Sequence, residues 1–437
     1  MQTKGHPIRV LILAEQANPE WVSVPLVGWH HAAALAPLVD AHLVTHAINR
    51  PAIERSFWPK DKVTYISLGM FDALMSWIIK HIFKGQFGTV ALTATRIPFY
   101  WLFERLAWRE LRDRIKRGDF DVVHRLTPVS PVMSSPIVRH CYRYGVPFVL
   151  GPVNGGLPWP RGYANALRKE REFLSRFRSL YMLLPFAGST YNKASAVVAA
   201  SRNTMDQIKD TLPRGKEQVL YYLPENGIPA ARVKTSQRQT PPIPLKAVFV
   251  GRLVPYKCAD VVLKAAAPLI RAGKLTLVII GDGPERGFLE AIIRDEKIGH
   301  GVSLAGWLPH GETMKCLESM DLLTFPSIRE FGGGVVVEGM AVGVVPIVMN
   351  YGGPGEIVTD DTGFRLPLSS ADQTVLDLRA VLERLVAEPS NVAKLSFAAQ
   401  ARIADHFTWE SKARGSLAIY ESLLKARSTK ASALSPA

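Results

Sequence analysis

Cysteine is scarce in this chain of 437 residues, which contains only Cys141, Cys258 and Cys316. Their odd number and wide spacing, without any C-x-x-C pair, argue against a disulfide framework or a zinc site. Such sparse use of cysteine is typical of a reducing compartment, and we therefore expect a cytoplasmic protein.

A long apolar run is also missing from the N-terminus. The first apolar run, Ile8 to Ala14, is seven residues long. It is too short to span a membrane and lacks the small-residue cleavage pattern of a signal peptide. We interpret this run as the first buried strand of the fold.

Acidic residues are too few in the N-terminal half to balance the basic ones. Residues 1–240 contain 32 Lys and Arg against 17 Asp and Glu, whereas the remainder contains 21 of each. This asymmetry suggests an anionic partner for the N-terminal half. Nucleic acid and an anionic membrane surface are both candidates, and a generally basic, solvated surface is the alternative.

Short β-branched runs alternate with helical stretches, which favours parallel sheets covered by helices on both faces. We predict an α/β protein of two doubly wound, Rossmann-like domains whose ligands bind in a cleft between them. The predicted strands are 9–14, 42–46, 64–68, 121–124, 147–150, 196–200 and 218–223 in the first domain, and 246–251, 275–281, 302–305, 322–326 and 344–349 in the second.

The domain boundaries follow from the same pattern. We expect an N-terminal domain over 1–226, completed by a C-terminal helix over 409–426. A linker rich in Pro, Lys, Arg and Gln spans 227–245, and the second domain spans 246–406. The Ser-, Ala- and Lys-rich tail over 428–437 is expected to be disordered.

The stretch from Met70 to Arg117 mixes apolar and basic residues, with Trp77, Trp101 and Trp108 among them. One interpretation is an amphipathic surface that lies on a membrane. The alternative is a pair of ordinary helices packed on the first sheet.

Two motifs of the second half can hold a phosphate. Gly251 ends a predicted strand and is followed by Arg252 and, five residues later, by Lys257. Two cations at a strand end beside a helix N-terminus can bind a diphosphate. In the second motif, three glycines at 332–334 precede a helix and let backbone amides approach a ligand. Glu330 and Glu338 flank this turn and can accept hydrogen bonds from a sugar and a ribose.

From Val248 to Pro367 the sequence resembles the donor domain of the family 4 glycosyltransferases, which have the GT-B fold. Several ordered motifs carry the resemblance. They are GRLVPYK (251–257), IGDGPE (280–285), GWLPHGE (306–312), the segment 321–327, the Glu330-x7-Glu338 pair, and the segment from Ala341 through Glu356.

This resemblance implies a role for each matching residue. Arg252 and Lys257 would hold the donor diphosphate, Glu330 would contact the transferred sugar, and Glu338 would bind the ribose hydroxyls. The remaining donor-binding positions are backbone sites at Gly333, Gly334 and Val335, and Leu308 in the segment expected to read the base. Where the family usually has Phe, two places after the first Glu, this chain has Gly332.

The N-terminal half resembles the family more weakly. Gly28 begins a GWHHAAAL segment that looks like the helix near the donor phosphates. Trp29, the next residue, is expected on the acceptor side. His124 ends a predicted strand, where it would donate to a sugar hydroxyl or simply cap the sheet. Asn154 and Gly155 lie in a Gly/Pro-rich run after the next strand and are expected on the acceptor side.

The resemblance implies a metal-independent hexosyltransferase of polysaccharide biosynthesis that retains anomeric configuration. The donor would be a UDP- or GDP-sugar, the acceptor a glycan or a lipid-linked glycan, and no cofactor, metal or nucleic acid is expected. Asp119-x-Asp121 precedes a buried strand and is interpreted as a loop, not as a metal-binding motif. The alternatives are a nucleotide-sugar 2-epimerase of the same fold and a non-catalytic nucleotide-sugar or polyanion binder.

Overall fold

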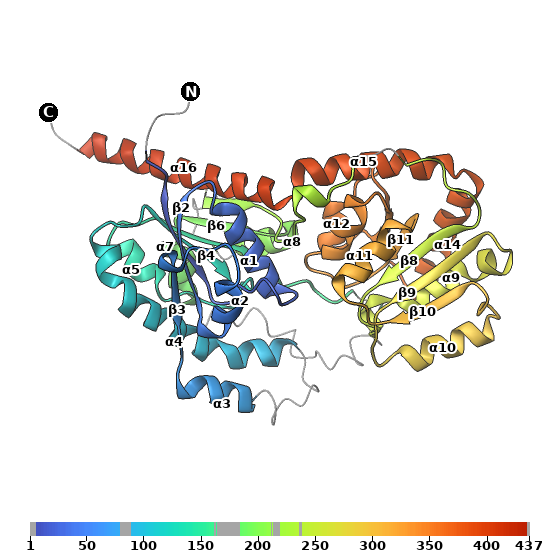
Figure 1. Cartoon of the computed structure of the whole chain (residues 1–437), viewed down its shortest axis with the longest axis horizontal. Helices are drawn as coiled ribbons and strands as arrows, with labels where there is room; N and C mark the ends of the chain where they lie inside the picture. Colours follow the sequence, from blue (N-terminus) through green and yellow to red (C-terminus); the bar gives the residue numbers. More distant parts are fainter. Residues whose placement is uncertain are drawn as a thin grey trace. The chain divides into compact units, whose positions relative to one another are not determined.

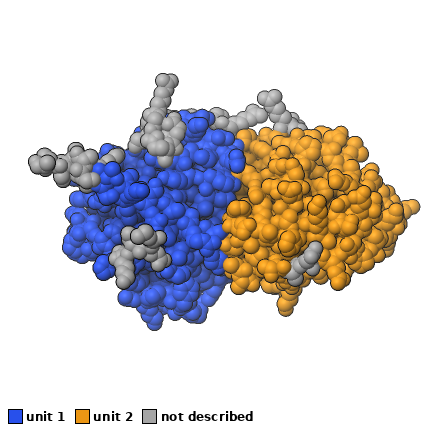
Figure 2. All heavy atoms as spheres, turned by 90° about the horizontal axis from the view of Figure 1, so that it is seen from above, with its two compact units in different colours: residues 1–156, 172–225, 409–437 blue, residues 157–171, 226–408 orange. Residues whose placement is uncertain are grey.

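The computed structural model describes residues 6–78, 89–160, 163, 184–210, 212, 219–235 and 238–434. The chain divides into two compact units (Figure 2). Unit 1 comprises residues 1–156, 172–225 and 409–437, and unit 2 comprises residues 157–171 and 226–408. Ile79, Ile82 and Phe83, which belong to the predicted amphipathic stretch, lie outside the described residues.

Unit 1 is built on a parallel sheet of seven strands (Figure 1). Its central strands are almost completely buried, as their continuous apolar sequences require. In order across the sheet, the strands are β3 (Val63–Ile66), β2 (Asp40–His46), β1 (Arg9–Ala14), β4 (Val122–Thr127), β5 (Phe148–Val153), β6 (Ala196–Ala199) and β7 (Leu220–Tyr222).

Helices cover both faces of this sheet. Leu11 and Leu13 face one apolar cluster, and Val10 and Ile12 face the other. The first cluster is completed by α4 (Thr89–Lys116), α5 (Val138–Arg143), α7 (Ala187–Lys193) and α8 (Arg202–Lys209), and the second by α1 (Val24–Leu35), α2 (Arg50–Glu54) and α16 (Trp409–Leu434). A further helix, α3 (Met70–Ile78), contacts α4.

Unit 2 contains a second parallel sheet, of six strands around one apolar core. The strands, in order across the sheet, are β10 (Val302–Gly306), β9 (Leu275–Ile280), β8 (Leu245–Val250), β11 (Leu322–Phe325), β12 (Val345–Met349) and β13 (Phe364–Leu366). The helices are α9 (Ala259–Arg271), α10 (Arg286–Asp295), α11 (His310–Glu318), α12 (Gly334–Ala341), α13 (Gly352–Ile357), α14 (Ala371–Ala387) and α15 (Ser390–His406).

All twelve predicted strands are present, so the prediction of two Rossmann-like α/β domains is confirmed. The sequence reading missed β13, whose three residues follow a turn and complete the edge of the second sheet. The predicted disordered tail is wrong for residues 428–434, which continue α16 because Lys, Ala and Leu favour helix. Residues 435–437 lie outside the described part of the chain.

The predicted linker belongs to unit 2 and packs against the rest of it. Ile228 pairs with Thr408, and the Arg238 guanidinium donates hydrogen bonds to the carbonyl oxygens of Met320, Glu318 and Val342. These bonds fix the segment before β8 to the C-terminal ends of α11 and α12 in the same unit. Residues 236 and 237 of the predicted linker are outside the described residues.

Gly28 is a packing requirement of unit 1. A Cβ at this position in α1 would lie 2.2 Å from the carbonyl oxygen of Gln16 and 2.8 Å from Cγ2 of Thr127. Only glycine therefore lets α1 lie this close to the ends of β1 and β4.

We expect Gly28→Ala to lower the free energy of unfolding by about 1–3 kcal/mol, the usual cost of overpacking. Gly188→Ala, in α7 of the same unit, is the matched control because a Cβ there meets nothing within 4 Å. Denaturant titration of both variants checks the prediction. If Gly28→Ala and Gly188→Ala have equal free energies of unfolding, α1 does not need to lie this close to the ends of β1 and β4.

Candidate functional site

The loop after β8 presents two cations at the carboxyl end of the second sheet. Gly281, with φ of 138°, directly follows the neighbouring strand β9, and a Cβ on it would lie 1.9 Å from the carbonyl oxygen of Gly251. The two loops therefore touch at their backbones, which requires glycine. Arg252 is exposed, and among the described residues its guanidinium has no carboxylate partner. Lys257 ends the short helix η8 (Pro255–Lys257).

Lys257 is joined to Glu330, although 73 residues separate them in the sequence. Its Nζ donates to Oε2 of Glu330, and it also lies 4.8 Å from the centroid of the Phe325 ring at the end of β11. Both side chains are mostly buried, with relative exposures of 14% and 22%. Two of the predicted donor-binding side chains thus meet at the edge where β8 and β11 lie next to each other.

Glu330 also contacts the glycine turn at the start of α12. Its Oε1 lies 3.4 Å from the backbone nitrogen of Gly333, which donates to it. Gly333 has φ of 62°, and a Cβ there would lie 2.9 Å from Cδ1 of Ile357. Gly334 and Val335 open α12, so their N–H groups are among those without partners inside the helix. The predicted phosphate turn therefore sits directly beside the Lys257–Glu330 pair.

Glu338, on α12, already has a partner that the sequence analysis did not recognise. Nε2 of His310 donates to its Oε1 at 2.9 Å. This hydrogen bond, more than any other influence, raises the pKa of His310 above 6.5. His310 begins α11, two residues after half-buried Leu308, and thereby holds the predicted ribose-binding carboxylate close to the predicted base-binding segment.

A second layer behind Glu330 also escaped the sequence analysis. The guanidinium carbon of Arg329 lies 4.8 Å from the centroid of the Trp159 ring, and this ring lies edge-on to Tyr256, 6.3 Å between centroids. Tyr351 Oη donates to the carbonyl oxygen of Pro158 at 2.8 Å. The Pro-Trp-Pro sequence at 158–160 was the available signal, but it gives no indication of the contacts with residues beside Lys257 and Glu330.

His124 lies in β4 of unit 1 with only 1% of its surface exposed. Its Nε2 donates to the carbonyl oxygen of Gly151 at 2.6 Å, so Nδ1 accepts from the hydroxyl of Tyr420 in α16. Burial lowers the pKa of His124 to about 4, so the ring is neutral at neutral pH. Both nitrogens are engaged inside unit 1, and contact with a sugar stays a prediction.

The other residues predicted in unit 1 have structural contacts. Gly28 permits the packing of α1, and Trp29 is a buried core residue whose ring lies 6.0 Å from that of Trp58. Asn154 Oδ1 accepts hydrogen bonds from Ser201 and Thr204 at the N-terminus of α8. The N–H of Gly155 donates to Thr204 Oγ1 at 3.1 Å. A role for them in binding donor or acceptor stays a prediction.

Within the described residues, no cluster of three His, Cys, Asp or Glu side chains could hold a metal ion. The same residues include no helix long and apolar enough to cross a membrane.

Residues 233–393 match the family described as "Glycosyl transferases group 1". A glycogen synthase of Mycobacterium tuberculosis is 26% identical over 230 residues, which cover 52% of this chain and 54% of the relative. A D-inositol 3-phosphate glycosyltransferase of Rhodococcus opacus is 34% identical over 185 residues, 39% of this chain and 40% of the relative. The chain thus spans about half the length of the curated relatives it matches.

Solved structures resemble the whole chain. HepE from Anabaena in complex with UDP has a TM-score of 0.61 at 16% identity, covering 97% of this chain and 100% of its own. A glycosyltransferase from Rickettsia africae has a TM-score of 0.62 at 15% identity, covering 96% of this chain and 99% of its own. These likenesses show the fold, which is GT-B with two parallel-sheet, Rossmann-like domains.

The His310–Glu338 bond has a direct spectroscopic consequence. We expect Glu338→Gln to lower the pKa of His310 toward 6.5, because the substitution removes the charge that favours the imidazolium. An NMR titration of the imidazole signals measures this change. His140, in unit 1, serves as an internal reference whose titration should stay in place. An unchanged His310 titration would show that the two side chains do not pair in solution.

Proposed function

We propose that the chain is a glycosyltransferase and that unit 2 binds its nucleotide diphosphate sugar. One observation carries this proposal: the Lys257–Glu330 pair lies against the glycine turn that begins α12. The match of residues 233–393 to "Glycosyl transferases group 1" supports it. The solved structures with UDP support a uridine nucleotide as the first donor to test.

The charges of this site suit a leaving diphosphate. Breaking the bond between sugar and phosphate places negative charge on the departing diphosphate, and fixed cations and amides can stabilise it. The first N–H groups of α12 can stabilise this charge. Arg252 can do the same, because it has no carboxylate partner among the described residues. Lys257 would turn from Glu330 to the diphosphate, which frees the carboxylate to accept from the sugar hydroxyls. Glu338 would exchange His310 for the ribose hydroxyls.

We further propose a hexosyl donor, independence of metal and retention of anomeric configuration. Retention would follow from attack on the same face that the diphosphate leaves, with a phosphate oxygen taking the proton of the acceptor hydroxyl. The acceptor oxygen then forms the new bond to the anomeric carbon as the sugar–phosphate bond breaks. His124, held neutral by burial, would donate a hydrogen bond to the sugar after releasing Gly151.

The acceptor is proposed to be a glycan or a lipid-linked glycan of polysaccharide biosynthesis, met at the cytoplasmic face of a membrane. The basic excess of residues 1–240 supports contact with an anionic surface. The exposed apolar side chains of α3 also support it, because Met70, Phe71, Leu74 and Trp77 recur at helical spacing.

Donor binding is tested by calorimetric titration with UDP and UDP-sugars, followed by transfer assays. We expect Arg252→Gln to weaken UDP binding by about 10- to 150-fold, since a charge-assisted hydrogen bond contributes about 1.5–3 kcal/mol. Glu330→Gln should leave UDP bound but abolish transfer. The matched controls are Arg294→Gln and Glu383→Gln, both exposed on helices of unit 2, which should behave like the parent chain.

The rival functions give different outcomes in the same assays. A 2-epimerase would consume the UDP-sugar without any acceptor and form no glycoside. A polyanion binder would not bind UDP in preference to other anions, and its affinity would fall steeply with salt. UDP binding that is unaffected by Arg252→Gln would contradict the proposed site.

Membrane contact is tested by co-sedimentation with vesicles that contain phosphatidylglycerol. Replacing Phe71 and Trp77 by serine should reduce the bound fraction by roughly tenfold or more, because a buried apolar side chain contributes about 1.5–3 kcal/mol. The control replaces exposed Val22 and Ile48, also in unit 1, by serine. If both double variants bind alike, α3 does not contact the bilayer.

A further inference from the structure

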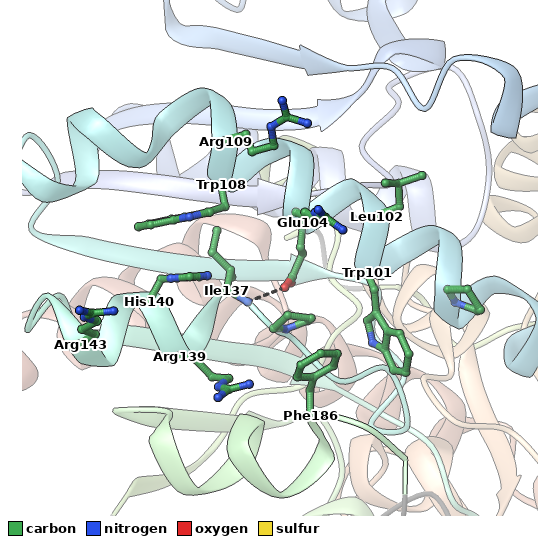
Figure 3. A pocket seen from close by; sticks show the side chains of 13 residues that line it. Trp101, Leu102, Glu104, Trp108, Arg109, Ile137, Arg139, His140, Arg143 and Phe186 are labelled. Atoms are coloured by element: carbon green, nitrogen blue, oxygen red, sulfur yellow. Dashed lines mark hydrogen bonds between the residues drawn. The ribbon is translucent and has the colours of Figure 1, made fainter.

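Unit 1 contains a pocket of about 830 Å³ that includes none of the residues proposed for sugar transfer (Figure 3). It is lined by side chains of α4, of α5 with the two residues before it, and of the residue preceding α7. These helices cover the same face of the sheet, and the pocket lies between α4 and α5 (Figure 3). Its volume is in the range of pockets that hold small-molecule ligands.

The floor of the pocket is apolar, and its polar groups are already bonded. Trp101 and Phe186 meet edge to face, 5.2 Å between ring centroids, and Leu102 lies nearby on α4 (Figure 3). The indole N–H of Trp101 donates to Ser134 Oγ at 3.0 Å. The Glu104 carboxylate is buried and accepts from the N–H of Ile137 at 3.0 Å and from two hydroxyl groups.

Positively charged side chains line the rim of the pocket. Arg105, Arg109, Arg139 and Arg143 line it and are exposed, and none has a carboxylate partner among the described residues. His140 stacks on Trp108 between them, with ring centroids 4.0 Å apart. Burial lowers the pKa of His140, and the positive charges of Arg139, Arg143 and Lys116 lower it further.

We propose that this pocket binds a phosphate-bearing amphiphile, with the phosphate at the arginine rim and the apolar chain on the aromatic floor. Guanidinium groups bind phosphate oxygens in pairs of parallel hydrogen bonds, and four of them line this pocket. A glycan fits the floor poorly, because its hydroxyls would need hydrogen-bonding groups and Trp101 and Glu104 are already engaged. The ligand can be a single dissolved molecule or the headgroup of a bilayer lipid.

Calorimetric titration of the full chain tests separately whether binding needs the phosphate and whether it needs the apolar chain. The probe is dihexanoyl phosphatidic acid below its critical micelle concentration. Glycerol phosphate, which lacks the chains, and dihexanoyl phosphatidylcholine, which lacks net charge, are the reference ligands. We expect phosphatidic acid to bind at least about tenfold more tightly than either, since each part of the pocket contributes. Equal binding of glycerol phosphate would overturn the proposal, because the floor would then play no part.

A pair of double variants tests the rim. Arg109→Gln with Arg143→Gln should weaken phosphatidic acid binding by at least about tenfold. Lys60→Gln with Lys209→Gln removes the same charge from exposed positions of unit 1 away from the pocket, and its affinity should stay within about twofold. All four positions are exposed, so both variants should fold, which their unfolding temperatures verify. If both double variants weaken phosphatidic acid binding equally, general surface charge accounts for the binding, and the proposed pocket is contradicted.

Vesicles that contain phosphatidic acid identify the source of the ligand. If the Arg109 and Arg143 double variant also loses vesicle binding, the pocket takes the headgroup of a bilayer lipid. If vesicle binding persists while binding of the dissolved lipid is lost, the pocket takes a single amphiphile. Because UDP binds at unit 2 in the proposed function, unchanged UDP binding by this variant separates the pocket from the sugar-transfer site.

Discussion

The candidate site of unit 2 depends on one ion pair, between Lys257 and Glu330, formed across 73 residues of sequence. It connects the loop after β8 to the loop after β11, and these two strands are neighbours in the sheet. Parallel strands deliver both loops to the same edge, so the topology brings the two charges together. The two charges satisfy each other, and in the proposed function a diphosphate with its sugar would offer each of them a replacement partner.

Close backbone approaches make this arrangement specific. Gly281 contacts Gly251, Gly333 adopts a left-handed conformation before α12, and Gly352 would place a Cβ 2.3 Å from the carbonyl oxygen of Glu330. Each of these positions excludes a larger side chain, so the loops have little freedom to separate. Behind them, Trp159 packs on Arg329 and Tyr256, the direct neighbours of the ion-paired residues. The charges are therefore held by packing as well as by attraction.

The strands and the glycine turn before α12 could be predicted because their signals are local. Apolar runs identify the strands, and Gly332, Gly333 and Gly334 identify the turn. The contacts of His310, Trp159 and His124 could not be predicted, since each partner lies far away in the sequence. The arginine-rimmed pocket was missed for a similar reason: Arg109 and Arg143 belong to different helices, and only the fold places them in the lining of one pocket. The short strand β13 lacks the length on which the pattern depends.

The most direct measurement is a crystal structure of the chain with UDP. We predict the diphosphate within hydrogen-bonding distance of Lys257 Nζ, Arg252 and the first N–H groups of α12, with the Lys257–Glu330 pair broken and the ribose at Glu338. A diphosphate bound elsewhere on the chain, or bound beside an intact Lys257–Glu330 pair, would contradict the exchange of partners on which the proposed function rests.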